Sequence, residues 1–349
     1  MSILEEDFRA LSQRLSPELS QLNGKSILLV GATGAISSYL GRFLINVLQT
    51  KIASFQLALT ARSEESLKKY YSEVDKSFFK CIFLDVKEPF QFTGQYDYII
   101  FAAGNADPKN IVNNPLDIIH TNYLGLHNTI EFAKKQTKTK IVFFSTREIY
   151  GMVSNKSVIE EDDIGVLNPL NFRSCYPEVK KLCENMLECA VDSYANLSYS
   201  ILRLAHIYGP GMNIQNDGRI MNDLVGMTVN GEGIKLLSDG SAVRAFCYIS
   251  DALTGIIKAM LVNENKAVFN IANETEAKSI REIVTLIQEI FPALVPSVEY
   301  AQNSNANSKG YFFTSRTELS TKRLESLGWK PETSLTEGLK KTIQSYLYN

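Results

Sequence analysis

The sequence has little histidine and cysteine, and no excess of basic charge. Its three histidines, His120, His127 and His206, are scattered, so we predict no metal site. The five cysteines are odd in number and lack metal-ligand spacing, which favours reduced thiols. A net charge of −2 argues against a nucleic-acid-binding surface. These absences favour an ordinary globular protein in a reducing compartment.

Long apolar runs are also missing. No stretch is apolar for long enough to span a bilayer, so we expect no membrane contact. The acidic segment 1–7 has no apolar core behind basic residues, unlike a secretory signal peptide. We therefore expect a cytoplasmic protein. A chain of 349 residues can bury one large core and support a smaller lobe as well.

Short apolar runs alternate with helical patterns through the first part of the chain. Six runs rich in branched and aromatic residues predict strands, at 27–30, 55–60, 81–86, 98–103, 140–145 and 199–204. Strands that alternate with helices predict an α/β fold with a doubly wound, Rossmann-type parallel sheet. Beyond residue 205 the pattern changes to short elements and glycine turns, which predicts a smaller C-terminal α/β lobe for substrate.

A glycine turn joins the first predicted strand to the next helix. Gly31 permits a tight turn, and Gly34 lets a phosphate approach the backbone at the helix N-terminus. Ser37 replaces the third glycine of the dinucleotide fingerprint and is still small enough for close packing. Two glycines alone also fit an ordinary βα turn. The predicted cofactor-binding residues of this turn are Gly31, Thr33, Gly34, Ala35 and Ile36.

The end of the second predicted strand bears on the choice of cofactor. It lacks the carboxylate that usually holds the ribose of NAD, and it carries Arg62 and Ser63 instead. A guanidinium suits a phosphate, which favours NADP. The alternative is NAD, with Arg62 stacked on adenine or solvated. Asp85 ends the third strand, where it either accepts a hydrogen bond from the adenine amino group or serves as a turn residue.

Tyr176 and Lys180 carry the predicted chemistry. Their spacing places both on one face of a helix. A phenol is a poor base at neutral pH, and a neighbouring ammonium lowers its pKa. The fifth strand ends at Thr146, whose hydroxyl can hydrogen-bond the substrate oxygen that Tyr176 deprotonates. We therefore predict acid–base catalysis at a hydroxyl or ketone.

Several motifs together resemble the extended short-chain dehydrogenases/reductases of the nucleotide-sugar epimerase/dehydratase group. They are Gly31-x-x-Gly34, Asn122-Tyr-Leu-Gly125, Ser145-Thr-Arg-Glu-Ile-Tyr-Gly151, Tyr176-x-x-x-Lys180, Arg203-x4-Tyr208-Gly-Pro-Gly211 and Leu327-Gly-Trp-x-Pro331. The resemblance implies hydride transfer at sugar C4, with Tyr176 as acid/base. Lys180 would hold the nicotinamide ribose and Thr146 the 4-oxygen. Further cofactor-binding residues, at the carboxyl edge of the sheet and in these motifs, are Val86, Ala102, Ala103, Gly104, Asn122 and Ser145.

Finer motifs resemble UDP-glucuronate decarboxylases and reductases of dTDP-4-keto-6-deoxyglucose. These are 173–176, 216–219 and 243–251. By this resemblance Arg244 contacts the diphosphate or the nucleoside ribose, and Arg219 is a weaker candidate for the same task. A surface ion pair is the alternative for each. The substrate-binding residues expected from the resemblance are Arg147, Arg203, Asn213, Arg219 and Arg244.

Glu148 and Arg147 bear on the type of reaction. The resemblance makes Glu148 the base of a dehydratase, but Arg147 stands where a dehydratase has its acid, and arginine does not donate protons. One hypothesis is that Arg147 pairs with an acidic group near sugar C6, as in a uronate. The alternative is that Arg147 points away and pairs with a nearby acid.

The leading functional prediction is a 4-keto reductase of a nucleoside-diphosphate hexose that uses NADPH. A 4-epimerase, a UDP-glucuronate decarboxylase or a 4,6-dehydratase with bound NAD is the alternative, which Glu148 favours. A non-catalytic dinucleotide-binding regulator is a third class. The predicted domains are a helical extension at 1–23, which packs on the main domain or forms an oligomer contact, a dinucleotide-binding domain at 24–205 and a substrate lobe at 206–349, with some interleaving of the sheet.

The resemblance also implies a homodimer through helices 111–134 and 177–194. Leu182, Met186 and Leu187 face either the second copy or the sheet. The polar tract 303–308 lies where substrate loops often occur.

Overall fold

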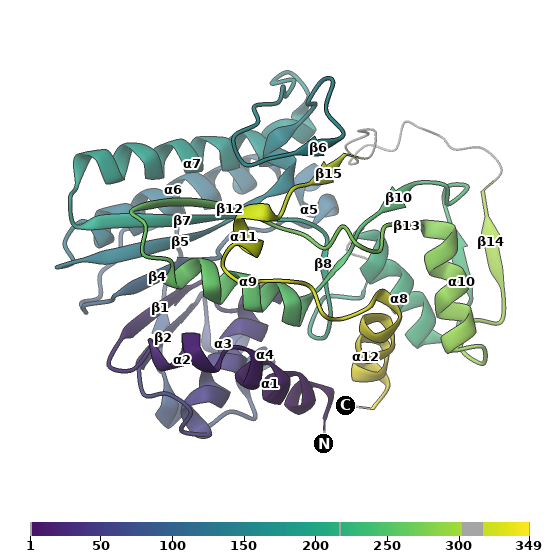
Figure 1. Cartoon of the computed structure of the whole chain (residues 1–349), viewed down its shortest axis with the longest axis horizontal. Coiled ribbons are helices and arrows are strands. Elements are labelled where there is room, and N and C mark those ends of the chain that lie inside the picture. The colour runs from purple at the N-terminus through teal and green to yellow at the C-terminus, as the bar shows by residue number, and fades with distance from the viewer. Residues whose placement is uncertain (1, 216–217, 302–316, 349) are drawn as a thin grey trace.

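A parallel sheet forms the centre of the computed structural model, which describes residues 2–215, 218–301 and 317–348. Seven strands pair in the order β12-β7-β5-β4-β1-β2-β3, and every neighbouring pair is parallel (Figure 1). The doubly wound α/β fold expected from the sequence is therefore confirmed. The strands are β1 (Ser26–Val30), β2 (Gln56–Ala61), β3 (Lys80–Phe83), β4 (Tyr98–Phe101), β5 (Thr139–Thr146), β7 (Leu197–Leu204) and β12 (Lys266–Ile271).

Strand β12 is the one member of this sheet that the sequence analysis does not predict. It lies beyond residue 206 and pairs with β7, with Phe269 opposite Leu202. Phe269 and Ile271 are buried although β12 is an edge strand, because helix α9 (Ile249–Leu261) packs over it. The central sheet thus takes its last strand from the part of the chain assigned to the C-terminal lobe.

Helices cover both faces of the sheet (Figure 1). Helices α6 (Pro115–Ala133) and α7 (Cys175–Ser193) pack on one face, where Leu187 is fully buried against the strands and Leu182 is exposed. The predicted helix 111–134 is interrupted before Pro115, which has no N–H to continue a helical ladder. The other helices of this domain are α3 (Ala35–Gln49), α4 (Glu64–Tyr71), α5 (Pro108–Asn113), α11 (Lys322–Glu325) and the 3-10 turns η1 (Lys76–Phe78), η2 (Arg147–Tyr150) and η3 (Phe172–Ser174).

A smaller lobe stands beside the carboxyl ends of the central strands (Figure 1). It is built on three helices, α8 (Ile220–Asn230), α10 (Ile280–Ile290) and α12 (Leu335–Leu347). Two-stranded pairs complete the lobe and its connections to the sheet. They are β8 (Ile207–Tyr208) with β11 (Cys247–Tyr248), β9 (Ile234–Leu236) with β14 (Val298–Tyr300), β10 (Val243–Arg244) with β13 (Lys278–Ser279), and β6 (Val158–Ile159) with β15 (Glu318–Leu319).

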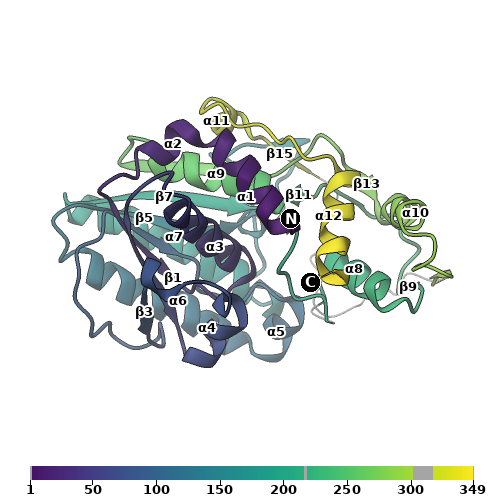
Figure 2. The same ribbon diagram turned by 90° about the horizontal axis from the view of Figure 1, so that it is seen from below.

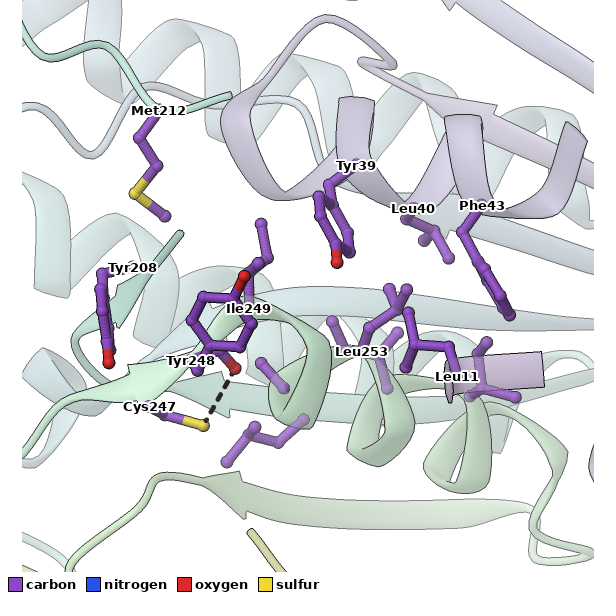
Figure 3. Packing of buried hydrophobic residues seen from close by; sticks show 14 of the residues in the cluster. Leu11, Tyr39, Leu40, Phe43, Tyr208, Met212, Cys247, Tyr248, Ile249 and Leu253 are labelled. Atoms are coloured by element: carbon purple, nitrogen blue, oxygen red, sulfur yellow. Dashed lines mark hydrogen bonds between the residues drawn. The ribbon is translucent and has the colours of Figure 1, made fainter. Parts of the chain in front are cut away.

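The N-terminal extension forms helices α1 (Ile3–Arg14) and α2 (Ser16–Ser20), which pack against α3, α9 and α12 (Figure 2). Figure 3 shows Leu11 of α1 close to Phe43 and Leu253, which belong to the same buried cluster. The Asp7 carboxylate, which is 2% exposed, accepts hydrogen bonds from the hydroxyls of Tyr39 (2.9 Å) and Tyr248 (2.6 Å). The extension is therefore part of the core.

A salt bridge from the same carboxylate reaches the lobe. Lys341 of α12 donates to Asp7 at 3.0 Å. Asp7 thus ties the extension to the sheet domain and to the lobe at once.

We predict that Asp7→Ala lowers the free energy of unfolding by about 2–4 kcal/mol, because it leaves the buried hydroxyls of Tyr39 and Tyr248 without their acceptor and takes from Lys341 one of its two carboxylate partners. Urea denaturation measures the change. Glu6→Ala is the matched control, since Glu6 is exposed on the same helix, and its effect stays below about 1 kcal/mol. Equal losses from the two variants would contradict a role for Asp7 in joining the domains.

Candidate functional site

A large cavity of about 2320 Å³ lies at the carboxyl edge of the sheet, between the sheet and the lobe. Its walls include the ends of β1, β4 and β5 on one side and Arg219 and Arg244 of the lobe on the other. In open α/β sheets, ligands bind at this edge. The cavity is therefore the candidate functional site.

The glycine turn at one end of the cavity has the shape that a pyrophosphate requires. Gly31 has φ +83°, and a Cβ there would lie 2.7 Å from the Ala103 backbone. Gly34 precedes helix α3 as its N-cap and has no side chain to cap it, so the first turn of α3 faces the cavity through Ala35 and Ile36. The hydroxyl of Ser37 donates to the carbonyl of Gly31 at 2.6 Å. The residues present thus fit a dinucleotide.

Of the residues predicted to select the cofactor, some line the cavity and others do not. Arg62 is exposed and lines the cavity. Ser63 does not line it, because its hydroxyl caps α4 and accepts from the Ser66 amide at 3.2 Å. Asp85 lines the cavity beyond the end of β3, and its carboxylate accepts from the Lys87 amide at 3.0 Å. Arg62 thus remains the one candidate of this strand end that reaches the wall.

Tyr176 and Lys180 lie side by side on α7, beneath the end of β5. Lys180 Nζ donates to the carbonyl of Phe144 at 2.7 Å and lies 5.9 Å from the Tyr176 ring centroid. Burial lowers the pKa of Lys180 to about 8. Burial and the charge of Glu148 raise the pKa of Tyr176, whereas its hydrogen bond with Thr146 opposes that rise. The protein's own groups therefore hold Tyr176 as a protonated phenol.

Glu148 places a carboxyl group in the cavity wall. Its Oε1 accepts from Arg173 Nη2 at 3.0 Å, whereas its buried Oε2 has no hydrogen-bond partner among the described residues. The sequence analysis assigned no role to Arg173, although it lies in the motif 173–176. The 3-10 turn η3, directly before α7, places Arg173 beside Glu148. This ion pair holds Glu148 on the same side of the cavity as Tyr176.

Arg147 also lines the cavity, and two neutral acceptors hold it there. Its Nη1 lies 3.2 Å from His206 Nε2, and its Nη2 donates to the Thr317 carbonyl at 3.2 Å. Burial, with the charges of Arg147 and Arg244, lowers the pKa of His206 to about 3. His206 is thus neutral at physiological pH and can accept the hydrogen bond. The sequence analysis considered His206 only as a metal ligand and missed this contact.

Arg203 does not line the cavity, contrary to the role expected for it in substrate binding. It is buried, and Glu184 holds its guanidinium through Nε (3.2 Å) and Nη2 (2.7 Å). Its Nη1 donates to the hydroxyl of Tyr150 at 2.8 Å. Arg203 is therefore a buried structural residue behind the wall.

Two of the predicted cofactor-binding residues use their polar groups elsewhere. Asn122 is fully buried behind Gly104, does not line the cavity and donates to the Ile118 carbonyl at 2.8 Å. Ser145 lines the cavity, but its hydroxyl donates to Glu184 at 2.5 Å. The remaining predicted residues, which all line the cavity, are Thr33, Val86, Ala102, Ala103, Gly104, Thr146, Asn213, Arg219 and Arg244. The tract 303–308 lies outside the described residues.

Two other kinds of feature are absent from the part of the chain that the structure describes. Within residues 2–215, 218–301 and 317–348, no group of three His, Cys, Asp or Glu side chains could hold a metal ion. In the same part of the chain, no helix is long and apolar enough to cross a membrane.

Comparisons with known proteins identify relatives in sequence and neighbours in fold. UDP-glucuronic acid decarboxylase 3 of Arabidopsis thaliana is 30% identical over 315 residues, which cover 90% of this chain and 86% of that protein. A UDP-N-acetylglucosamine 4-epimerase from Methanobrevibacter ruminantium M1, solved with UDP-N-acetylmuramic acid, superposes with a TM-score of 0.79 at 19% identity (93% and 99% coverage). MoeE5, solved with UDP-glucuronic acid and NAD, superposes with a TM-score of 0.73 at 23% identity (92% and 98% coverage).

A family model described as the NAD dependent epimerase/dehydratase family matches residues 27–272. This range begins in β1 and ends just after β12, so it includes the glycine turn, Tyr176, Lys180 and all of the central sheet except Ser26. The chain belongs to the NAD dependent epimerase/dehydratase family.

Proposed function

We propose that this protein oxidises a nucleoside-diphosphate sugar at C4 and reduces it again within one turnover, without net consumption of its dinucleotide. One observation carries the proposal: Glu148 and Tyr176 are two acid–base groups in one cavity. Reduction of a ketone needs one proton donor. Inversion at C5 or loss of the C6 carboxylate, next to a 4-ketone formed between two hydride transfers, also moves a proton at C5 and so has a task for a second group. The names of the relatives, which are decarboxylases and epimerases of UDP sugars, support this reading.

The residues of the chain have separate tasks in this scheme. Tyr176 takes the proton of the 4-hydroxyl as C4 is oxidised and gives it back at the end, while Thr146 holds the same oxygen. Lys180 holds the nicotinamide ribose and favours the phenolate form of Tyr176. A bound nicotinamide dinucleotide supplies the hydride acceptor. Glu148, fixed by Arg173, serves as the second acid–base group on the sugar.

We assign Arg147 to the substituent at sugar C6. Its guanidinium is fixed at the cavity wall by His206 and the Thr317 carbonyl, and a guanidinium binds a carboxylate strongly. A uronate is therefore the proposed substrate class. Such an ion pair stabilises the carboxylate of the ground state and opposes its loss, which favours epimerisation over decarboxylation.

A second candidate function is a 4-keto reductase that uses exchangeable NADPH. The position of Arg62 favours it, because this exposed guanidinium lines the cavity near the end of β2, where a 2′-phosphate would lie. No carboxylate of β2 competes for that place, since the strand contains neither Asp nor Glu. Arg62 is equally able to stack on adenine in an NAD enzyme, and Glu148 has no task in a simple reductase.

We predict that purified protein converts a UDP hexuronate or UDP hexose without added dinucleotide, and that Tyr176→Phe lowers this turnover by about 10²–10⁴-fold. Chromatography of the sugar nucleotides measures the products. The matched control is Tyr199→Phe, because that buried hydroxyl contacts Glu188 outside the cavity, and its turnover stays near that of the wild type. Conversion that requires one NADPH per product would contradict internal redox and support the reductase.

We also predict that Arg147→Ser lowers kcat/KM for a UDP hexuronate about 10–100-fold more than for the matching neutral UDP hexose, because one charge-assisted hydrogen bond contributes about 1.5–3 kcal/mol. Steady-state kinetics with the two substrates measure the difference. Equal losses on both sugars would exclude a contact between Arg147 and the acidic group.

A further inference from the structure

Three consecutive residues at the end of β5 contact α7 near the reacting groups. The carbonyl of Phe144 accepts from Lys180, and Thr146 forms a hydrogen bond with Tyr176. Between them, the Ser145 hydroxyl donates to Glu184 at 2.5 Å. Tyr176, Lys180 and Glu184 follow each other at intervals of four residues, so they share one face of the helix. Glu184 is thus the third contact of this face with β5.

Glu184 is itself held from the neighbouring strand. Arg203 on β7 stands opposite Ser145 on β5, and its guanidinium binds both carboxylate oxygens of Glu184. The same guanidinium donates to the hydroxyl of Tyr150 at 2.8 Å, and Tyr150 donates to Asn270 of β12 at 2.7 Å. The network therefore runs from α7 through the sheet to η2, the turn that carries Arg147 and Glu148.

We propose that Glu184 is a positioning residue, which locks α7 against the end of β5 and so fixes Tyr176 and Lys180. The network extends this effect to η2, because Arg203 joins Glu184 to Tyr150. The inference rests on the proposed roles of Tyr176 and Lys180 at a bound dinucleotide.

The charge of Glu184 has a second effect, on the ammonium one turn away. Burial lowers the pKa of Lys180, and Cys183 and Glu184 oppose this fall. Burial raises the pKa of Cys183 to about 11, so this thiol carries no charge at neutral pH. Glu184 is therefore the charged neighbour that opposes the fall in the pKa of Lys180. The other titratable or charged groups around the pair are Tyr176 on α7, Glu148 on η2, Arg173 on η3, Arg203 on β7 and Arg219 before α8.

The test is Glu184→Gln, which keeps the shape of the side chain and removes its charge. Loss of a nearby opposite charge lowers the pKa of Lys180, and the Arg203 charge left behind lowers it further. In this scheme the dinucleotide is released as the pH rises and Lys180 loses its proton. We therefore expect release from Glu184→Gln at a pH about one unit lower than from the wild type. Ultrafiltration of the holoenzyme at a series of pH values measures the retained dinucleotide.

Glu188→Gln is the matched control, since Glu188 lies one turn further on α7 and pairs with Lys266 at 2.6 Å, at the surface. Its release profile stays at the wild-type pH. Glu184→Asp keeps the charge and shortens the side chain, so we expect a wild-type release pH with a several-fold lower kcat and little change in KM. If Glu184→Gln folds poorly, the kcat of Glu184→Asp still tests the positioning role.

Release of dinucleotide from Glu184→Gln at the wild-type pH, or an unchanged kcat for Glu184→Asp, would overturn the inference and leave Glu184 a purely structural residue. The release test measures retention of the dinucleotide and needs no sugar substrate, so its result does not depend on the proposed reaction. A wild-type protein that keeps its dinucleotide and converts no UDP sugar would thus overturn the proposed function, while the release test still decides the role of Glu184.

Discussion

The burial of one ammonium is the constraint on which the site depends. Lys180 is 4% exposed, and a charge in such a place is stable only when other groups compensate its lost hydration. One carbonyl of β5 accepts its hydrogen bond, and the ring of Phe143 lies 4.6 Å from Nζ. These contacts require α7 to lie closely against the end of β5. The same packing brings Tyr176 to Thr146 and places both at the carboxyl edge of the sheet.

Three sets of contacts from other parts of the chain surround the carboxyl edge of the sheet. The lobe brings Arg219 and Arg244 to the opposite wall of the cavity. Arg147 bridges His206 and the Thr317 carbonyl, so the turn η2 is joined to two distant segments of the chain. The N-terminal helix joins the sheet domain to the lobe through Asp7, although it lies outside the range of the family model. Domain contacts, rather than any single loop, therefore set the shape of the cavity.

Local patterns in the sequence were enough to predict the parts of the site that depend on neighbours along the chain. The glycine turn at Gly31 and the four-residue spacing of Tyr176 and Lys180 are such features, because turn and helix geometry are local. Contacts between distant segments could not be read in this way. Arg203 resembled a ligand-binding arginine, and its true partner, Glu184, is known only once β7 lies beside α7. The contact of His206 with Arg147 and the edge strand β12 depend on the tertiary fold in the same manner.

Internal redox is the central claim, and the dinucleotide that the purified protein carries tests it most directly. The protein would be denatured, and the released nucleotide identified by mass. The account predicts NAD or NADH in near-stoichiometric amount, because a hydride that returns within each turnover needs no exchange of the cofactor. A site without dinucleotide that binds NADPH much more tightly than NADH would contradict it, and would make Arg62 the determinant of an exchangeable NADPH.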